Sequence, residues 1–69
     1  MEFVYILVGN NFDWEDMVIF LSKDEAIFVS RNNPTSRVEI FKKNELCFGY
    51  SPTYNYYLDG ELINTRKTT

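Results

Sequence analysis

The residues of this chain that could do chemistry are a group of carboxylates and one thiol. The polar segment 10–16 carries five oxygen-bearing side chains: Asn10, Asn11, Asp13, Glu15 and Asp16. Calcium takes about six to eight oxygen ligands at ordered spacing, and the glycine-containing EF-hand pattern is missing. Two of these acids could form a catalytic dyad only inside a pocket, so solvated charges are the simpler interpretation. We therefore predict no metal site and no cofactor.

The one thiol has no partner that would make it a nucleophile. The chain contains no histidine, the commonest general base, and its single cysteine, Cys47, lies between Leu46 and Phe48. This setting favours a buried, inert thiol, and a lone cysteine excludes an intramolecular disulfide. The three glycines are isolated, so the sequence offers no phosphate cradle. We predict that the protein is not an enzyme.

The composition is that of one small domain spanning residues 1–69. It is 45% hydrophobic and 17% aromatic, with a net charge of −3. A domain of this size lies near the lower limit for folding without staples, so a homodimer would add stability. No signal-peptide or membrane-spanning pattern is present, which predicts a cytoplasmic protein with no membrane partner. The negative charge argues mildly against duplex nucleic acid as a partner, and nucleic acid in general is not expected.

The charges are unevenly distributed along the chain. Residues 1–30 contain six acids and one lysine, whereas residues 31–69 contain six basic residues and four acids. An acidic half and a weakly basic half could orient head-to-tail or dimer contacts. Ordinary solvated surface explains the same pattern.

The clearest local signal in the chain predicts a helix. Ser22 followed three residues later by Glu25 is a capping-box pattern, which predicts a helix over residues 23–31. The apolar run 26–29 does not fit a single stripe, because Phe28 points away from the others. Either a partner or a loop covers Phe28, or this segment is not a regular helix.

Runs of β-branched and aromatic residues predict strands on both sides of this helix. The expected strands are residues 3–8, 17–21, 37–42, 54–58 and 61–65, with 46–50 as an optional short strand. Alternation in the third strand places Val38 and Ile40 inward and Phe41 outward. The order β-β-α-β-(β)-β predicts an α+β fold, with a small antiparallel sheet and one helix packed on one face. Residues 65–69 are expected to be a frayed tail.

The last two strands surround Asp59-Gly60, which predicts a two-residue hairpin turn. This turn sets Leu58 opposite Glu61, Tyr57 opposite Leu62 and Tyr56 opposite Ile63. The expected core face then carries Tyr54, Tyr56, Leu58 and Ile63. Tyr57 and Leu62 would lie on the other face beside Phe41, in an exposed apolar patch of the kind that marks binding surfaces.

Trp14, within the acidic segment FDWED, has two interpretations. It could fold back as a lid over the core, or it could anchor a partner, since tryptophan and tyrosine dominate binding hot spots. The candidate partner-binding residues are Trp14, Phe28, Phe41, Tyr57 and Leu62. The edge strand left by the final hairpin offers β-augmentation as a further route to a partner.

Single-stranded nucleic acid is the alternative partner. Aromatic side chains on an antiparallel sheet can stack bases, and Tyr57, Phe41 and Phe48 could do so. Arg37, Lys42 and Lys43 would lie nearby. Core packing explains the same aromatic residues without any ligand.

The patterns FVYILVG, VIFLSKDEAIFVS, RVEIF and YNYYLDGEL together cover nearly the whole chain. In this outline the sequence resembles small uncharacterised domains encoded by phages and large DNA viruses. The shared motifs are a helix cap and a turn, so no functional residue is carried over. The resemblance implies a viral accessory protein. We expect a non-enzymatic module that binds another protein, as an accessory or inhibitory factor acting as a homodimer or on a host protein.

Overall fold

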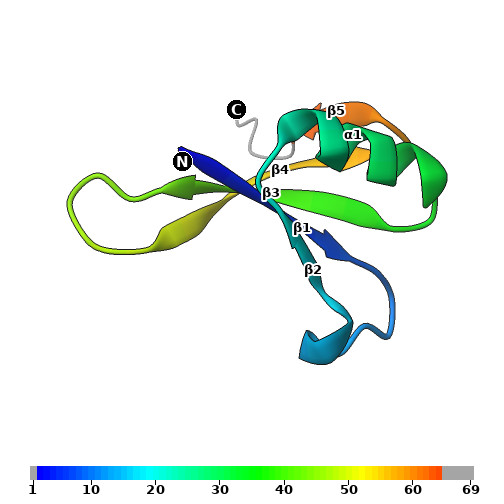
Figure 1. The fold of residues 1–69 in the computed structure, drawn as a ribbon, viewed down its shortest axis with the longest axis horizontal. Helices are drawn as coiled ribbons and strands as arrows, with labels where there is room; N and C mark the ends of the chain where they lie inside the picture. Colours follow the sequence, from blue (N-terminus) through cyan, green and yellow to red (C-terminus); the bar gives the residue numbers. More distant parts are fainter. Residues whose placement is uncertain (1, 65–69) are drawn as a thin grey trace.

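The computed structural model describes residues 2–64, which form one α-helix packed on one face of a five-stranded antiparallel sheet (Figure 1). The strands are β1 (Phe3–Val8), β2 (Val18–Phe20), β3 (Arg37–Lys43), β4 (Tyr50–Leu58) and β5 (Glu61–Asn64). They lie in the order β2-β1-β3-β4-β5. The helix α1 (Lys23–Asn32) connects β2 to β3, and a short 3-10 helix, η1 (Trp14–Asp16), lies between β1 and β2. The expected α+β fold is confirmed, while residues 65–69 lie outside the described part.

The helix begins and ends where its capping signals predict. The Ser22 hydroxyl accepts a hydrogen bond from the Glu25 backbone N–H (3.4 Å), and the helix ends before Pro34. Its buried face consists of Ala26 and Ser30, which are fully enclosed against the sheet. The helix is regular despite its apolar run, and Phe28 lies on the solvent side with 68% of its surface exposed. Within residues 2–64, therefore, no loop covers Phe28.

The core lies between α1 and the sheet. Its buried apolar residues are Tyr5, Ala26, Val38, Ile40 and Tyr57, with Leu7, Phe20 and Ile27 packed partly against them. The rings of Tyr5 and Tyr57 stand 6.3 Å apart at a tilt of 42°. Such aromatic pairs supply much of the buried apolar area in a small domain. Val38 and Ile40 point inward as expected.

The final hairpin has the predicted register, but its inward face is the opposite one. Leu58 pairs with Glu61, Tyr57 with Leu62 and Tyr56 with Ile63. Tyr57 is 7% exposed and belongs to the core, because β4 also pairs with β3 and sets Tyr57 opposite the buried Val38. Directly paired residues point to the same face of a sheet. The expectation that Tyr57 lies beside Phe41 on an exposed face is therefore wrong.

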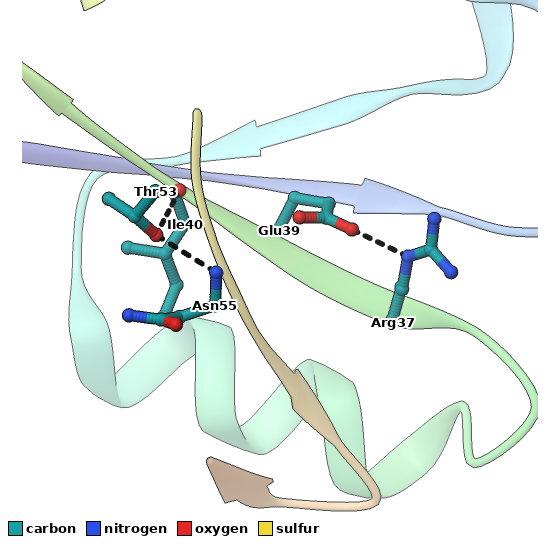
Figure 2. A network of polar contacts seen from close by, with 5 residues as sticks. All are labelled: Arg37, Glu39, Ile40, Thr53 and Asn55. Atoms are coloured by element: carbon teal, nitrogen blue, oxygen red, sulfur yellow. Dashed lines mark hydrogen bonds and ion pairs between the residues drawn. The ribbon is translucent and has the colours of Figure 1, made fainter. Parts of the chain in front are cut away.

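A bulge in β4 separates the part of the sheet under α1 from the outer part of the β3–β4 hairpin. The pairing shifts between Glu39 and Phe41. The Thr53 hydroxyl donates to the Ile40 carbonyl (2.9 Å) and accepts from the Asn55 N–H (3.1 Å), so one side chain bonds both strands here (Figure 2). Tyr54, inside the bulge, has φ of 68°, in the left-handed region. Bulges bend and twist a strand pair, and the outer half of β3–β4 extends away from the body as an arm (Figure 1).

Candidate interaction site

The arm formed by β3 and β4 ends in a loop of residues 44–49, here called the tip loop. It carries two apolar side chains that face solvent almost completely: Leu46 is 97% exposed and Phe48 is 101% exposed. They flank Cys47, which is also exposed. Figure 1 shows the loop at the far end of the arm, remote from α1. Two bare apolar side chains at a projecting point are typical of a contact site.

Hydrogen bonds from Asn44 hold the tip loop in one conformation. Its side-chain amide donates to the Phe48 carbonyl (3.0 Å), and its backbone N–H donates to the Gly49 carbonyl (3.0 Å). The Ser51 hydroxyl donates to the side-chain oxygen of Asn44 (2.8 Å). Gly49 has φ of 91°, which glycine adopts without steric cost. Because the loop backbone is braced in this way, less backbone entropy is lost when Leu46 and Phe48 bind a partner.

The charges around the tip loop are mainly positive. Lys42 and Lys43 end β3 at the base of the loop, and both are exposed. Glu45 is the one acid in the loop. The tip loop therefore has apolar side chains at its end and positively charged lysines where it joins the arm.

The tip loop was missed by the expectations drawn from the sequence. Residues 46–49 form no strand, since β4 begins at Tyr50, so the optional strand over 46–50 is wrong. Cys47 is exposed, so the expectation of a buried thiol is wrong as well. Asn44 and Gly49 were the available signals, because these residue types favour turns. They bracket an apolar triplet whose composition alone indicated burial.

The candidate residues taken from the sequence do not gather into one site. Trp14, in η1, is 78% exposed and does not cover the core, so the lid interpretation is wrong. Phe28 is exposed on α1, and Tyr57 lies in the core. Phe41 is half-buried and lies on the face of the sheet opposite α1, since it neighbours the inward Ile40. Leu62 is exposed on β5, on the α1 side beside Tyr57.

The face of the sheet opposite α1 is a second apolar surface. Ile6 on β1, Phe41 on β3 and Tyr56 on β4 are each half-buried there. Arg37 crosses this face, with its guanidinium 5.3 Å from the centre of the Tyr56 ring and its Nε 2.6 Å from a Glu39 carboxylate oxygen (Figure 2 shows the ion pair). This stacking and ion pairing cover part of the apolar area, so the tip loop is the barer of the two surfaces.

A shallow hollow lies along α1. It has a volume of ≈ 430 Å³ and is lined by Phe20, Asp24, Glu25, Phe28 and Val29. Phe28 forms one wall from the helix, and Phe20 forms another from β2. The floor and walls are apolar, while Asp24 and Glu25 add negative charge from the first turn of the helix. The hollow could therefore receive an apolar side chain that has a basic neighbour.

Burial raises two pKa values, and both belong to core tyrosines. The pKa of Tyr57 is raised by burial. The pKa of Tyr5 is raised by burial and by the neighbouring Tyr57, while Lys23 partly lowers it. Desolvation disfavours the phenolate in both cases. Since both tyrosine side chains pack in the core between α1 and the sheet, these shifts mark packing rather than a reactive centre.

Residues 2–64 contain no cluster of three or more histidine, cysteine, aspartate or glutamate side chains that could hold a metal ion. Over the same residues, the structure has no helix with the length and apolar character needed to cross a membrane. No protein-family model matches this chain, and no curated protein or solved structure matches it either.

Proposed function

We propose that the protein is a non-enzymatic interaction module that binds another protein by inserting its tip loop into an apolar site on the partner. The observation that carries this proposal is the near-complete exposure of Leu46 and Phe48 on a loop braced by Asn44. A role as a viral accessory or inhibitory protein, suggested by the resemblance of the sequence, is part of the same proposal.

The energetics of the tip loop support this function. Full burial of a leucine or phenylalanine side chain contributes roughly 1.5–3 kcal/mol each. Two such side chains, one of them aromatic, form the kind of compact anchor on which binding energy concentrates. The bonds made by Asn44 reduce the ordering cost that a flexible loop would add. The apolar residues therefore stabilise a complex while contributing nothing to the core of the monomer.

Native mass spectrometry of protein purified from its natural host tests this proposal. We expect a second polypeptide at fixed stoichiometry with the wild-type chain, and its loss with Leu46→Ala/Phe48→Ala. The control is Trp14→Ala, which removes another exposed aromatic side chain, from η1 outside the tip loop, and should retain the partner. Thermal midpoints should be unchanged in both variants, because neither site touches the core. Retention of the partner by the double variant would contradict the proposal.

Nucleic acid as the partner is supported less well. Of the three aromatic residues expected to stack bases, Tyr57 lies in the core. Adding salt separates the two partners, because binding driven by phosphates weakens steeply with salt. Apolar burial at the tip loop keeps a protein partner bound when salt screens the charges of Lys42 and Lys43. A steep loss of the bound partner between low and moderate salt would favour nucleic acid.

A further inference from the structure

From the two apolar surfaces of this chain we infer that the partner of the tip loop is a second copy of the protein. The tip of one copy occupies the hollow on α1 of the other. This inference rests on the proposed function of the tip loop and names its partner.

The hollow and the tip match in apolar character. The hollow of ≈ 430 Å³ exposes Phe28, an aromatic residue on the solvent side of a regular helix, next to Phe20 and Val29. Small ligand pockets have volumes of roughly 300–1,000 Å³. The hollow is in this range, so it offers room for the ring of Phe48 with Leu46 against its rim. The contact would cover the two most exposed side chains of the tip together with the bare Phe28.

The charges of the two surfaces are complementary. Asp24 and Glu25 line the hollow, and Lys42 and Lys43 stand at the base of the tip. Glu45 is the one tip residue whose charge opposes the contact. The two charged groups come from the two halves of the chain: the acids belong to the acidic residues 1–30, and the lysines belong to the more basic residues 31–69. Complementary charges fix the orientation of an apolar contact and exclude wrong partners.

The two surfaces of one molecule cannot meet each other. The β3–β4 arm extends away from α1, so the tip lies remote from the hollow of its own copy (Figure 1). The interface is isologous if two copies exchange tips reciprocally about a two-fold axis. It is heterologous, and continues as a chain of copies, if each tip binds the hollow of a further copy. In the closed pair both hollows are occupied by a tip, and in the open chain every hollow except the one at the end is occupied.

Cys47 supplies a direct test, because it is the only cysteine of the chain and lies exposed between Leu46 and Phe48. A benzophenone-maleimide probe is attached to Cys47, labelled and unlabelled (¹⁵N) copies are mixed and irradiated, and the cross-linked peptides are mapped. We expect heavy-to-light cross-links into residues 20–29. The control carries the probe at Thr35→Cys in a Cys47→Ser background and should give none there. Cross-links elsewhere, or none at concentrations up to about millimolar, would overturn the inference.

Charge reversal provides a second test that does not depend on the probe. Lys42→Glu/Lys43→Glu and Asp24→Lys/Glu25→Lys should each weaken self-association by roughly tenfold or more, since ~1.4 kcal/mol corresponds to tenfold. An equimolar mixture of the two variants should regain association in sedimentation velocity, because the reversed tip then faces a reversed hollow. Failure of the mixture to associate more strongly than either variant alone would overturn the inference. The thermal midpoint of each variant, compared with that of the wild type, tests whether the variant is folded.

The two proposals can fail separately. If a different polypeptide depends on Leu46 and Phe48 while the chain shows no self-association, the second copy is the wrong partner and the tip remains the binding element. If neither a partner nor self-association depends on the tip, both proposals are wrong.

Discussion

Tyr5 and Tyr57 are the two tyrosines in the small core between α1 and the sheet. Their rings approach each other from β1 and β4, on either side of β3, and both side chains are buried. Burial raises both pKa values above the ordinary tyrosine value, and the neighbouring Tyr57 raises the pKa of Tyr5 further. The folded state therefore holds these protons more tightly than the unfolded chain does, which links stability to pH.

We expect the free energy of unfolding to fall as the pH rises above about 10, the ordinary pKa of tyrosine. The contribution of the two tyrosines is complete below that pH and is lost as the pH rises through the raised pKa values of the folded state. Urea denaturation from about pH 8 to about pH 11, on both sides of the ordinary tyrosine pKa, measures this fall. Tyr5→Phe/Tyr57→Phe should make it shallower, while Tyr54→Phe, at an exposed position, should not. If the free energy of unfolding of the double variant fell with pH as steeply as that of the wild type, the two tyrosines would not be the cause of the fall.

At the scale of the elements, one hydroxyl joins the helix to the final hairpin. Ser30 is fully buried on α1, and its Oγ accepts a hydrogen bond from the Gly60 N–H (2.8 Å) in the turn between β4 and β5. Asp59 and Gly60 have φ values of 51° and 82°, as the two-residue hairpin turn requires. The turn is therefore bonded directly to the helix that covers the sheet.

Ser30→Ala should lower the free energy of unfolding by about 1–3 kcal/mol, because the Gly60 N–H loses its acceptor in a partly enclosed site. Urea denaturation measures the change. Thr35→Ala, which alters an exposed hydroxyl, should change the free energy by no more than about 0.5 kcal/mol. A Ser30→Ala variant as stable as the control would show that water replaces the bond.

For the whole molecule, one helix covers one face of the sheet, and the enclosed apolar set within residues 2–64 is small. It comprises Tyr5, Ala26, Val38, Ile40 and Tyr57. A small domain has a free energy of unfolding of roughly 5–15 kcal/mol, and short chains lie at the low end. Each buried ring therefore carries a large share of the stability. Leu46 and Phe48 of the tip and Phe28 of the α1 hollow contribute nothing comparable, since they face solvent.

Tyr57→Ala should destabilise the protein by about 3–5 kcal/mol, the range for truncating a large buried aromatic side chain. Because small domains are only marginally stable, the variant should be partly unfolded at about 37 °C. Leu62→Ala, at the paired and exposed position on β5, should cost less than about 1 kcal/mol. Urea denaturation monitored by circular dichroism compares the two. If Tyr57→Ala were as stable as the wild type, this result would contradict the place of Tyr57 in the core.

Local patterns in the sequence determined most of the fold. Ser22 and Glu25 mark the start of α1, and Asp59-Gly60 marks the hairpin turn and its register. These features follow from capping chemistry, side-chain period and turn geometry, all of which act over a few residues. The α+β class and the inward position of Val38 and Ile40 follow from the same patterns.

Only the tertiary structure decided which side chains are buried and where the candidate sites lie. The hairpin alone gives Tyr57 and Tyr56 opposite faces without saying which one is inside; the pairing of β4 with β3, opposite Val38, settles that choice. The exposure of Leu46 and Phe48 depends on the bulge at Thr53 and on the bracing by Asn44, which together carry the tip away from the core. Burial is a property of the neighbours that folding brings together, so an apolar triplet such as Leu46-Cys47-Phe48 reads as core in the sequence and stands in solvent in the structure.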